Sequence, residues 1–142
     1  MKAVIICLNQ KFGSRTGETL AEELNLAYAD CDRAISENLA ALGIPLQEFT
    51  LETLEQNERE VVKTCLKNNI ATMTYDLFAR HRARVKGDII YIKLDESKVD
   101  KLNQIAYSTR DLRLINIAKY VIKANTIENA VTQIKNTIGE EK

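Results

Sequence analysis

The longest helical periodicity in the chain runs through residues 17–42, and it constrains the fold more than any other feature. Apolar side chains recur there every three or four residues, which places them on one face of a helix with 3.6 residues per turn. A capping box of Thr19 and Glu22 favours a helix start, and Gly43 favours a helix end. The sequence therefore predicts one long amphipathic helix with the buried stripe Leu20, Leu24, Ala27, Cys31, Ile35, Leu39 and Leu42.

Further apolar stripes predict five more helices, near residues 51–66, 70–85, 99–106, 112–122 and 127–138. Two other runs, residues 3–8 and 89–94, are rich in β-branched or aromatic side chains, which are typical of strands. Residues 44–50 contain Pro45 and indicate an extended connection or a short edge strand. We therefore expect an α+β fold that is predominantly helical, with about six helices and a small two- or three-stranded antiparallel sheet.

The charges are balanced overall but unbalanced between the two halves. The chain has 20 Lys and Arg residues and 20 Asp and Glu residues. Residues 1–60 hold five basic and eleven acidic side chains, a net charge of −6, whereas residues 61–142 hold fifteen and nine, a net charge of +6. Such asymmetry fits either an anionic partner or two halves that neutralise each other. Because no linker is rich in Pro, Gly or Ser, we expect a single domain with an acidic helical half (1–60), a basic half (61–139) and a charged tail (140–142).

The cysteine pattern indicates a reducing compartment. Cys7, Cys31 and Cys65 are odd in number, widely spaced and without a Cys-x-x-Cys pair, so they do not suggest a disulfide framework. Each lies among apolar positions, and we expect three inert thiols in the core. The apolar run in residues 1–8 is too short for a secretory signal, and no run approaches the roughly 20 residues of a membrane span. We therefore expect a cytoplasmic protein with no membrane partner.

The titratable residues offer little support for catalysis. His81 is the only histidine, and it lies on the apolar phase of its helix, which favours a structural role. The paired carboxylates Glu22 and Glu23, and Glu58 and Glu60, lie on acidic helix faces without the burial that raises the pKa of a general acid. No spacing of cysteine, histidine and carboxylate residues matches a metal site. We therefore expect a non-enzymatic protein with no catalytic residue, no metal and no cofactor.

The densest positive charge lies in residues 80–86, Arg-His-Arg-Ala-Arg-Val-Lys, with no acidic residue between Asp76 and Asp88. Clustered guanidinium groups bind phosphates, and an aromatic ring beside them can stack on a base. Tyr91 and Lys93 share one face of the strand that follows. The alternative is a solvated surface that faces the acidic helices. The preferred interpretation is a nucleic-acid interface made of Arg80, Arg82, Arg84, Lys86, Tyr91 and Lys93.

Two short segments resemble known families. Residues 90–96, Ile-Tyr-Ile-Lys-Leu-Asp-Glu, are similar to the strand and helix start of ribbon-helix-helix proteins, in which two chains pair strands in the major groove. That resemblance implies a homodimer with Tyr91 and Lys93 facing the bases. Residues 12–19, Phe-Gly-Ser-Arg-Thr-Gly-Glu-Thr, resemble the flavodoxin loop that wraps the phosphate of flavin mononucleotide (FMN). That resemblance implies phosphate binding by Ser14, Thr16 and Thr19.

Three functions follow in order of preference. The first is a non-enzymatic nucleic-acid-binding accessory or regulatory protein that contacts phosphates through the basic segment. The second is a protein-interaction adaptor or inhibitor whose acidic helical face binds a basic partner. The third is a flavodoxin-like protein that binds FMN. A homodimer is compatible with the first two, since a small sheet leaves edges that proteins usually pair or cover.

Overall fold

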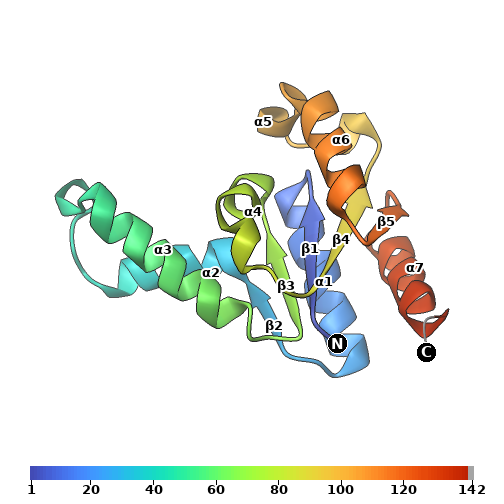
Figure 1. The fold of residues 1–142 in the computed structure, drawn as a ribbon, viewed down its shortest axis with the longest axis horizontal. Helices are drawn as coiled ribbons and strands as arrows, with labels where there is room; N and C mark the ends of the chain where they lie inside the picture. Colours follow the sequence, from blue (N-terminus) through green and yellow to red (C-terminus); the bar gives the residue numbers. More distant parts are fainter. Residues whose placement is uncertain (141–142) are drawn as a thin grey trace.

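The structure, a computed structural model, describes residues 1–140 and contains a five-stranded sheet in which all strands are parallel. The strand order is β2-β3-β1-β4-β5. β1 lies at the centre of the sheet, and all of its residues are buried (Figure 1). The strands are β1 Ala3–Cys7, β2 Tyr28–Asp30, β3 Ile70–Met73, β4 Asp88–Lys93 and β5 Tyr120–Lys123.

Helices connect each strand to the next, because a parallel pair needs a long crossover. The α-helices are α1 Gln10–Leu24, α2 Cys31–Ala41, α3 Leu51–Cys65, α4 Tyr75–His81, α5 Lys101–Gln104, α6 Tyr107–Ile117 and α7 Ile127–Glu140. Short 3-10 helices lie in the connections: η1 Leu46–Glu48, η2 Arg82–Arg84 and η3 Glu96–Lys98. No helix within residues 1–140 is long and apolar enough to cross a membrane.

The helices cover both faces of the sheet and form two apolar cores. On one face, Leu20 of α1 and Ile134 of α7 are buried against the strands. On the other face, Val62 of α3, Phe78 of α4 and Leu114 of α6 are buried. Successive side chains of each strand point to opposite cores, as the pleat of a strand requires. The architecture is therefore a three-layer α/β fold.

The predicted α+β fold with a small antiparallel sheet is wrong. β1 and β4 coincide with the two predicted strands and are neighbours, but they run parallel, with Ala3 opposite Asp88. β3 lies within a segment predicted as a helix, and β5 overlaps the end of another. Strands of a parallel sheet are buried on both faces and lack the alternation that identifies strands on one-sided sheets. A short apolar run such as Ile70–Met73 therefore cannot be distinguished from a helical segment by its periodicity.

The predicted helix over 17–42 is in fact two helices separated by β2. α1 begins directly after Asn9, whose side chain accepts a hydrogen bond from the Phe12 N–H. It ends at Asn25, which adopts the left-handed conformation (φ 54°, ψ 50°) that closes many helices. α2 begins only at Cys31. The apolar stripe therefore crosses a strand, and its regular spacing is a coincidence of two separate helices.

α1 packs closely against the sheet because Gly17 has no side chain. A Cβ at this position would lie 2.4 Å from Cγ2 of Thr72 in β3 and 2.9 Å from Cε1 of Tyr28 in β2. The Tyr28 hydroxyl also shares a hydrogen bond with the Thr72 hydroxyl (2.9 Å) and donates to the carbonyl of Ser14 (3.0 Å). These contacts fix the first half of α1 against β2 and β3.

Candidate functional site

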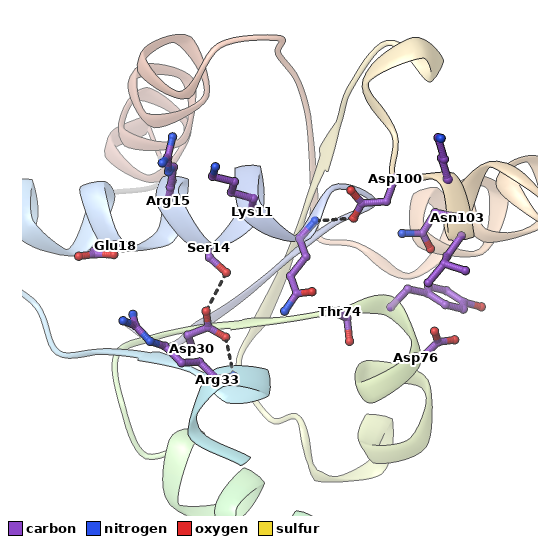
Figure 2. A pocket seen from close by; sticks show the side chains of 14 residues that line it. Lys11, Ser14, Arg15, Glu18, Asp30, Arg33, Thr74, Asp76, Asp100 and Asn103 are labelled. Atoms are coloured by element: carbon purple, nitrogen blue, oxygen red, sulfur yellow. Dashed lines mark hydrogen bonds between the residues drawn. The ribbon is translucent and has the colours of Figure 1, made fainter. Parts of the chain in front are cut away.

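A cavity of about 790 Å³ lies at the carboxyl edge of the sheet (Figure 2). The chain passes from β1 to β2 and β3 on one side of β1, and β4 then lies on the other side, so the strand order reverses at β1. Ligands of open parallel sheets bind in the crevice at such a reversal. The walls of the cavity come from α1, the start of α2, the start of α4 and residues 100–103.

α1 contributes a row of charged side chains to this cavity. Lys11, Arg15 and Glu18 lie three or four residues apart and therefore share one side of the helix. Neither Lys11 nor Arg15 has an acidic partner within the part of the chain that the structure describes. Arg33 of α2 lines the same cavity and pairs with the exposed Glu37 (3.3 Å). Unpaired cations in a hollow attract anions, so the cavity can accept a phosphate or carboxylate group.

Asp30 connects α1 to α2 at the side of the cavity. It is the last residue of β2 and caps α2, because one carboxylate oxygen accepts a hydrogen bond from the Arg33 N–H (3.2 Å). The other oxygen accepts a hydrogen bond from the Ser14 hydroxyl (2.8 Å), as Figure 2 shows. Asp30 is therefore held in one orientation by two elements.

Asp32 is a half-buried carboxylate beside the cavity. Its two oxygens accept hydrogen bonds from the Thr74 N–H and the Thr74 hydroxyl, each at 2.8 Å. Burial raises the pKa of Asp32 above its ordinary value, although the bonds from Thr74 act in the opposite direction. Asp32 also borders a small hollow that Gln10 and Ser14 line. A carboxylate with a raised pKa is suited to accept a proton from a bound hydroxyl group.

The N-terminus of α1 is bound by a carboxylate of the chain itself. The Gln10 N–H donates to Oδ2 of Asp100 (2.9 Å; Figure 2), and the Asp100 N–H donates to the carbonyl of Leu8 (2.9 Å). The side chain of Asn9 donates to the carbonyl of Lys98 (2.9 Å). The segment after β4 is thus fixed over the turn between β1 and α1. A negative charge occupies the end of the helix that favours anions.

The carboxylates of the site are spread around the cavity. Asp76, in the first turn of α4, accepts a hydrogen bond from Arg110 (3.0 Å) and lies on a different wall from Asp30. Within residues 1–140, no three His, Cys, Asp or Glu side chains are grouped so that they could hold a metal ion. A metal ion would therefore bind together with a ligand that supplied further oxygen atoms.

The basic segment that the sequence singled out lies away from this cavity, because it precedes β4 and so lies near the amino edge of the sheet. Arg80 makes two hydrogen bonds to the Glu58 carboxylate (2.9 and 3.1 Å). His81 is buried, and its Nε2 also contacts Glu58 (2.6 Å), while its Nδ1 contacts Arg84 (3.2 Å). Hydrogen bonds from Arg80 and His81 lower the pKa of Glu58, although burial opposes them. This cluster joins α4 to α3.

The other predicted interface residues are dispersed. Tyr91 is 1% exposed and donates to Asp111 (2.5 Å), and Lys93 binds the same carboxylate (3.0 Å). Arg82 and Lys86 have no partner within the described residues, and they line two separate hollows. The structure therefore does not bring the six side chains together on one surface. That they contact a nucleic acid is a prediction that the fold does not test.

The segment that resembles the flavodoxin loop is part of α1. Thr16 is buried and donates to the carbonyl of Phe12 (2.8 Å), and Ser14 donates to Asp30. Thr19 lies further along the same helix, so the three hydroxyls do not converge on one point. The strand order 2-3-1-4-5 also differs from the 2-1-3-4-5 order of flavodoxins.

The sequence patterns miss the polar residues in and beside the cavity. Asp30 ends β2, Asp32 follows two residues later, and Thr74 directly follows β3. Polar residues at the carboxyl ends of parallel strands meet at one edge of the sheet, which is a usable signal. It requires that β2 and β3 be recognised as strands, and both lie in segments with a helical pattern.

Solved structures share this fold over nearly its whole length, although no family model and no curated protein matches the sequence. Shikimate kinase from Aquifex aeolicus vf5 has a TM-score of 0.68 at 16% identity, covering 99% of this chain and 98% of that one. Shikimate kinase from Acinetobacter baumannii, in complex with shikimate, has a TM-score of 0.68 at 18% identity, covering 100% and 95%. Shikimate kinase from Bacteroides thetaiotaomicron has a TM-score of 0.66 at 14% identity, covering 97% and 98%.

These structures contradict the predicted function. A non-enzymatic nucleic-acid-binding regulator was expected, whereas these three solved structures with the same fold are shikimate kinases. The prediction that the chain is not an enzyme is contradicted by the same likeness. The two predictions failed because the parallel sheet was not recognised in the sequence. The cavity and its carboxylates lie at the edge where the parallel strands end, so they could not be found without the sheet. At 14–18% identity the likeness establishes the architecture: the chain has the fold of shikimate kinases.

Proposed function

We propose that this chain is a kinase-type enzyme that phosphorylates a small polar metabolite in the carboxyl-edge cavity. The observation that carries the proposal is the half-buried Asp32 beside a cavity whose wall holds Lys11 and Arg15, neither of which has an acidic partner among residues 1–140. Phosphoryl transfer needs a group that takes the proton of the attacking hydroxyl and positive charge that stabilises the phosphoryl oxygens. The fold shared with shikimate kinases supports the same class of reaction.

Residues in and beside the cavity have distinct roles in this proposal. Asp32 accepts the proton of the substrate hydroxyl, and Thr74 holds its carboxylate in place through two hydrogen bonds. Arg33 binds an acidic group of the substrate. The Mg²⁺ that accompanies a nucleotide binds through one or two carboxylates and the phosphates themselves, and Asp76 would supply one such carboxylate.

The phosphate donor is held by side chains rather than by backbone. Many nucleotide-binding enzymes bind phosphates on a G-x-x-x-x-G-K-[ST] loop between a strand and a helix. This sequence has no such motif, and only Leu8 and Asn9 separate β1 from α1. Asp100 further occupies the helix N-terminus where a phosphate would otherwise bind. We therefore assign the donor phosphates to Lys11 and Arg15, and we expect a weaker nucleotide affinity than a glycine loop provides.

The test is phosphoryl transfer from MgATP to a panel of hydroxylated carboxylic acids, shikimate included, followed by phosphorus NMR. Asp32→Asn is expected to lower turnover by about 10²–10⁴-fold, the usual contribution of a general base, without abolishing ligand binding. Lys11→Ala with Arg15→Ala is expected to weaken donor binding. Lys63→Ala, an exposed cation on α3, is the matched control and should change neither. If the wild-type chain neither transfers phosphate nor binds MgATP saturably, the proposal is refuted.

Two broader expectations belong to the same proposal. The chain acts as one domain, because both cores share the single sheet. It acts in the cytoplasm, because its cysteines are free thiols that a reducing compartment maintains. Fractionation of cells that express the tagged chain tests the second expectation, and a majority of the chain in an oxidising compartment would contradict it.

A further inference from the structure

Two cysteines face each other where the α2–α3 hairpin meets the sheet. Cys31 is the first residue of α2, and Cys65 is the last residue of α3. The two helices lie side by side and run in opposite directions (Figure 1). Asn38 donates a side-chain hydrogen bond to Asn57, which sets their register. Cys31 lies seven residues before Asn38 and Cys65 eight residues after Asn57, about two turns in each helix, so the register places the two cysteines opposite each other.

The contact between the two sulfur atoms makes them chemically unequal. Both side chains are buried in the same core, with Cys31 0% and Cys65 5% exposed. The Cys31 thiol donates a hydrogen bond to the Cys65 sulfur, which lowers the pKa of Cys65. The same bond, together with burial and the nearby Asp32, raises the pKa of Cys31. Cys65 is therefore the more acidic thiol of the pair, and thiolates are the reactive form of cysteine.

Cys7 provides an internal comparison. It is buried in the other core, on β1, and burial raises its pKa to about 12. It has neither a second thiol within its core nor a lowered pKa. The chain thus contains one inert thiol and one pair with the arrangement of an attacking and a resolving cysteine.

We propose that Cys31 and Cys65 are a redox site that forms a reversible disulfide when the chain meets a hydroperoxide. The Cys65 thiolate attacks one peroxide oxygen, the O–O bond breaks, and Cys65 becomes a sulfenic acid while hydroxide or alkoxide leaves. The Cys31 sulfur then attacks the Cys65 sulfur, the S–O bond breaks, and the S–S bond forms. The proton of Cys31 and the departing hydroxide give water. Two electrons pass from the sulfur pair to the peroxide, and a small thiol reverses the link by exchange.

The disulfide would act directly on the candidate site, because Cys31 lies between Asp30 and Asp32. Disulfide sulfurs lie about 2.05 Å apart, closer than two hydrogen-bonded thiols, so we expect the bond to draw the first turn of α2 toward α3. That movement would pull Asp32 away from Thr74 and Asp30 away from Ser14. We therefore expect the oxidised chain to bind its ligand more weakly. This consequence rests on the proposed function, whereas the disulfide itself does not.

The experiment treats the full chain with hydrogen peroxide, alkylates the remaining thiols under denaturing conditions, and measures intact and peptide masses. The expected result is a loss of two hydrogen atoms, a linked peptide pair that contains Cys31 and Cys65, and an alkylated Cys7. A small thiol restores the starting mass. Cys7→Ser should react as the wild type does. Cys31→Ser should stop at a sulfenic acid on Cys65 that a sulfenic-acid reagent traps.

Other results would overturn the proposal. These are an unchanged mass in the wild type, a link that includes Cys7, or a Cys65→Ser chain that loses the two hydrogen atoms. Because these masses are measured without ligand, the outcome does not depend on whether the chain is a kinase. MgATP binding before and after oxidation then measures the regulatory effect separately. Equal affinity in the two states would contradict the regulation and leave the disulfide standing.

Discussion

The carboxylate of Asp100 stabilises the N-terminus of α1, and two substitutions of Asp100 measure by how much. Asp100→Asn keeps an acceptor for the Gln10 N–H and removes the charge, whereas Asp100→Ala removes both. A negative charge at a helix N-terminus contributes about 0.3–1 kcal/mol. A hydrogen bond to a charged group contributes about 1.5–3 kcal/mol, and the lower end applies because Asp100 is partly exposed. We therefore expect unfolding free energies lower by about 0.5 kcal/mol for Asp100→Asn and by roughly 1.5–2 kcal/mol for Asp100→Ala.

Urea denaturation at two salt concentrations separates the two contributions. The Debye length is about 10 Å at 0.1 M salt and about 3 Å at 1 M salt, so high salt screens the charge but not the lost hydrogen bond. The deficit of Asp100→Asn should therefore shrink at high salt, and most of the deficit of Asp100→Ala should remain. Asp95→Ala is the control, because Asp95 is exposed and its side chain caps no helix. If Asp100→Ala costs no more than Asp95→Ala, the carboxylate does not stabilise α1 and the reasoning is refuted.

Two further predictions concern packing and pH. Gly17→Ala should be less stable than Gly13→Ala by about 1–3 kcal/mol in urea denaturation. Both variants gain the same helix propensity, but a Cβ at Gly17 lies 2.4 Å from Cγ2 of Thr72. Equal stabilities would contradict the close contact. The second concerns Glu58, whose pKa is lowered chiefly by its hydrogen bond from Arg80. A depressed pKa contributes stability above the unfolded value near pH 4.3, which is lost as the pH falls through the folded value. The wild-type chain should therefore be more stable than Glu58→Gln at pH 7, and this difference in unfolding free energy should disappear below about pH 4. A difference that stays constant from pH 7 to pH 3 would contradict the lowered pKa of Glu58.

The sequence predicts the two strands that contain enough β-branched residues to be recognised, β1 and β4. Their direction cannot be read from the same pattern, because parallel pairing depends on the crossovers between the strands. β2 has only three residues, Tyr28–Asp30, and joins two helices whose apolar spacing happens to match. The left-handed Asn25 is the local signal that α1 has ended, and asparagine tolerates that conformation better than most residues. The long predicted helix is wrong because this signal was outweighed by an apolar stripe.

Some of the opposite charges of the two halves form ion pairs with each other. Glu58 in the acidic half binds Arg80 in the basic half, and Glu23 binds Lys135 (3.1 Å). Such pairs match the alternative in which the two halves neutralise each other. A search for dense charge along the sequence does not detect the candidate site, because its residues come from distant segments. Single cations such as Lys11 do not raise the local charge density. They become a site only through the topology of the sheet.

The position of Asp100 also decides how a phosphate donor could be recognised. A glycine loop offers backbone N–H groups, which an alanine substitution does not remove. In this chain the Gln10 N–H is already bound to Asp100, so an anion in the cavity would meet positive side chains instead, Lys11 and Arg15 of α1 together with Arg33 and Lys101. Side-chain recognition predicts that replacing Lys11 and Arg15 with alanine removes most of the donor affinity. Asp100→Ala, which removes a negative charge beside the cavity, should leave that affinity unchanged or raise it. If instead Asp100→Ala abolishes binding while the double replacement preserves it, the donor is positioned by the segment after β4, and side-chain recognition is refuted.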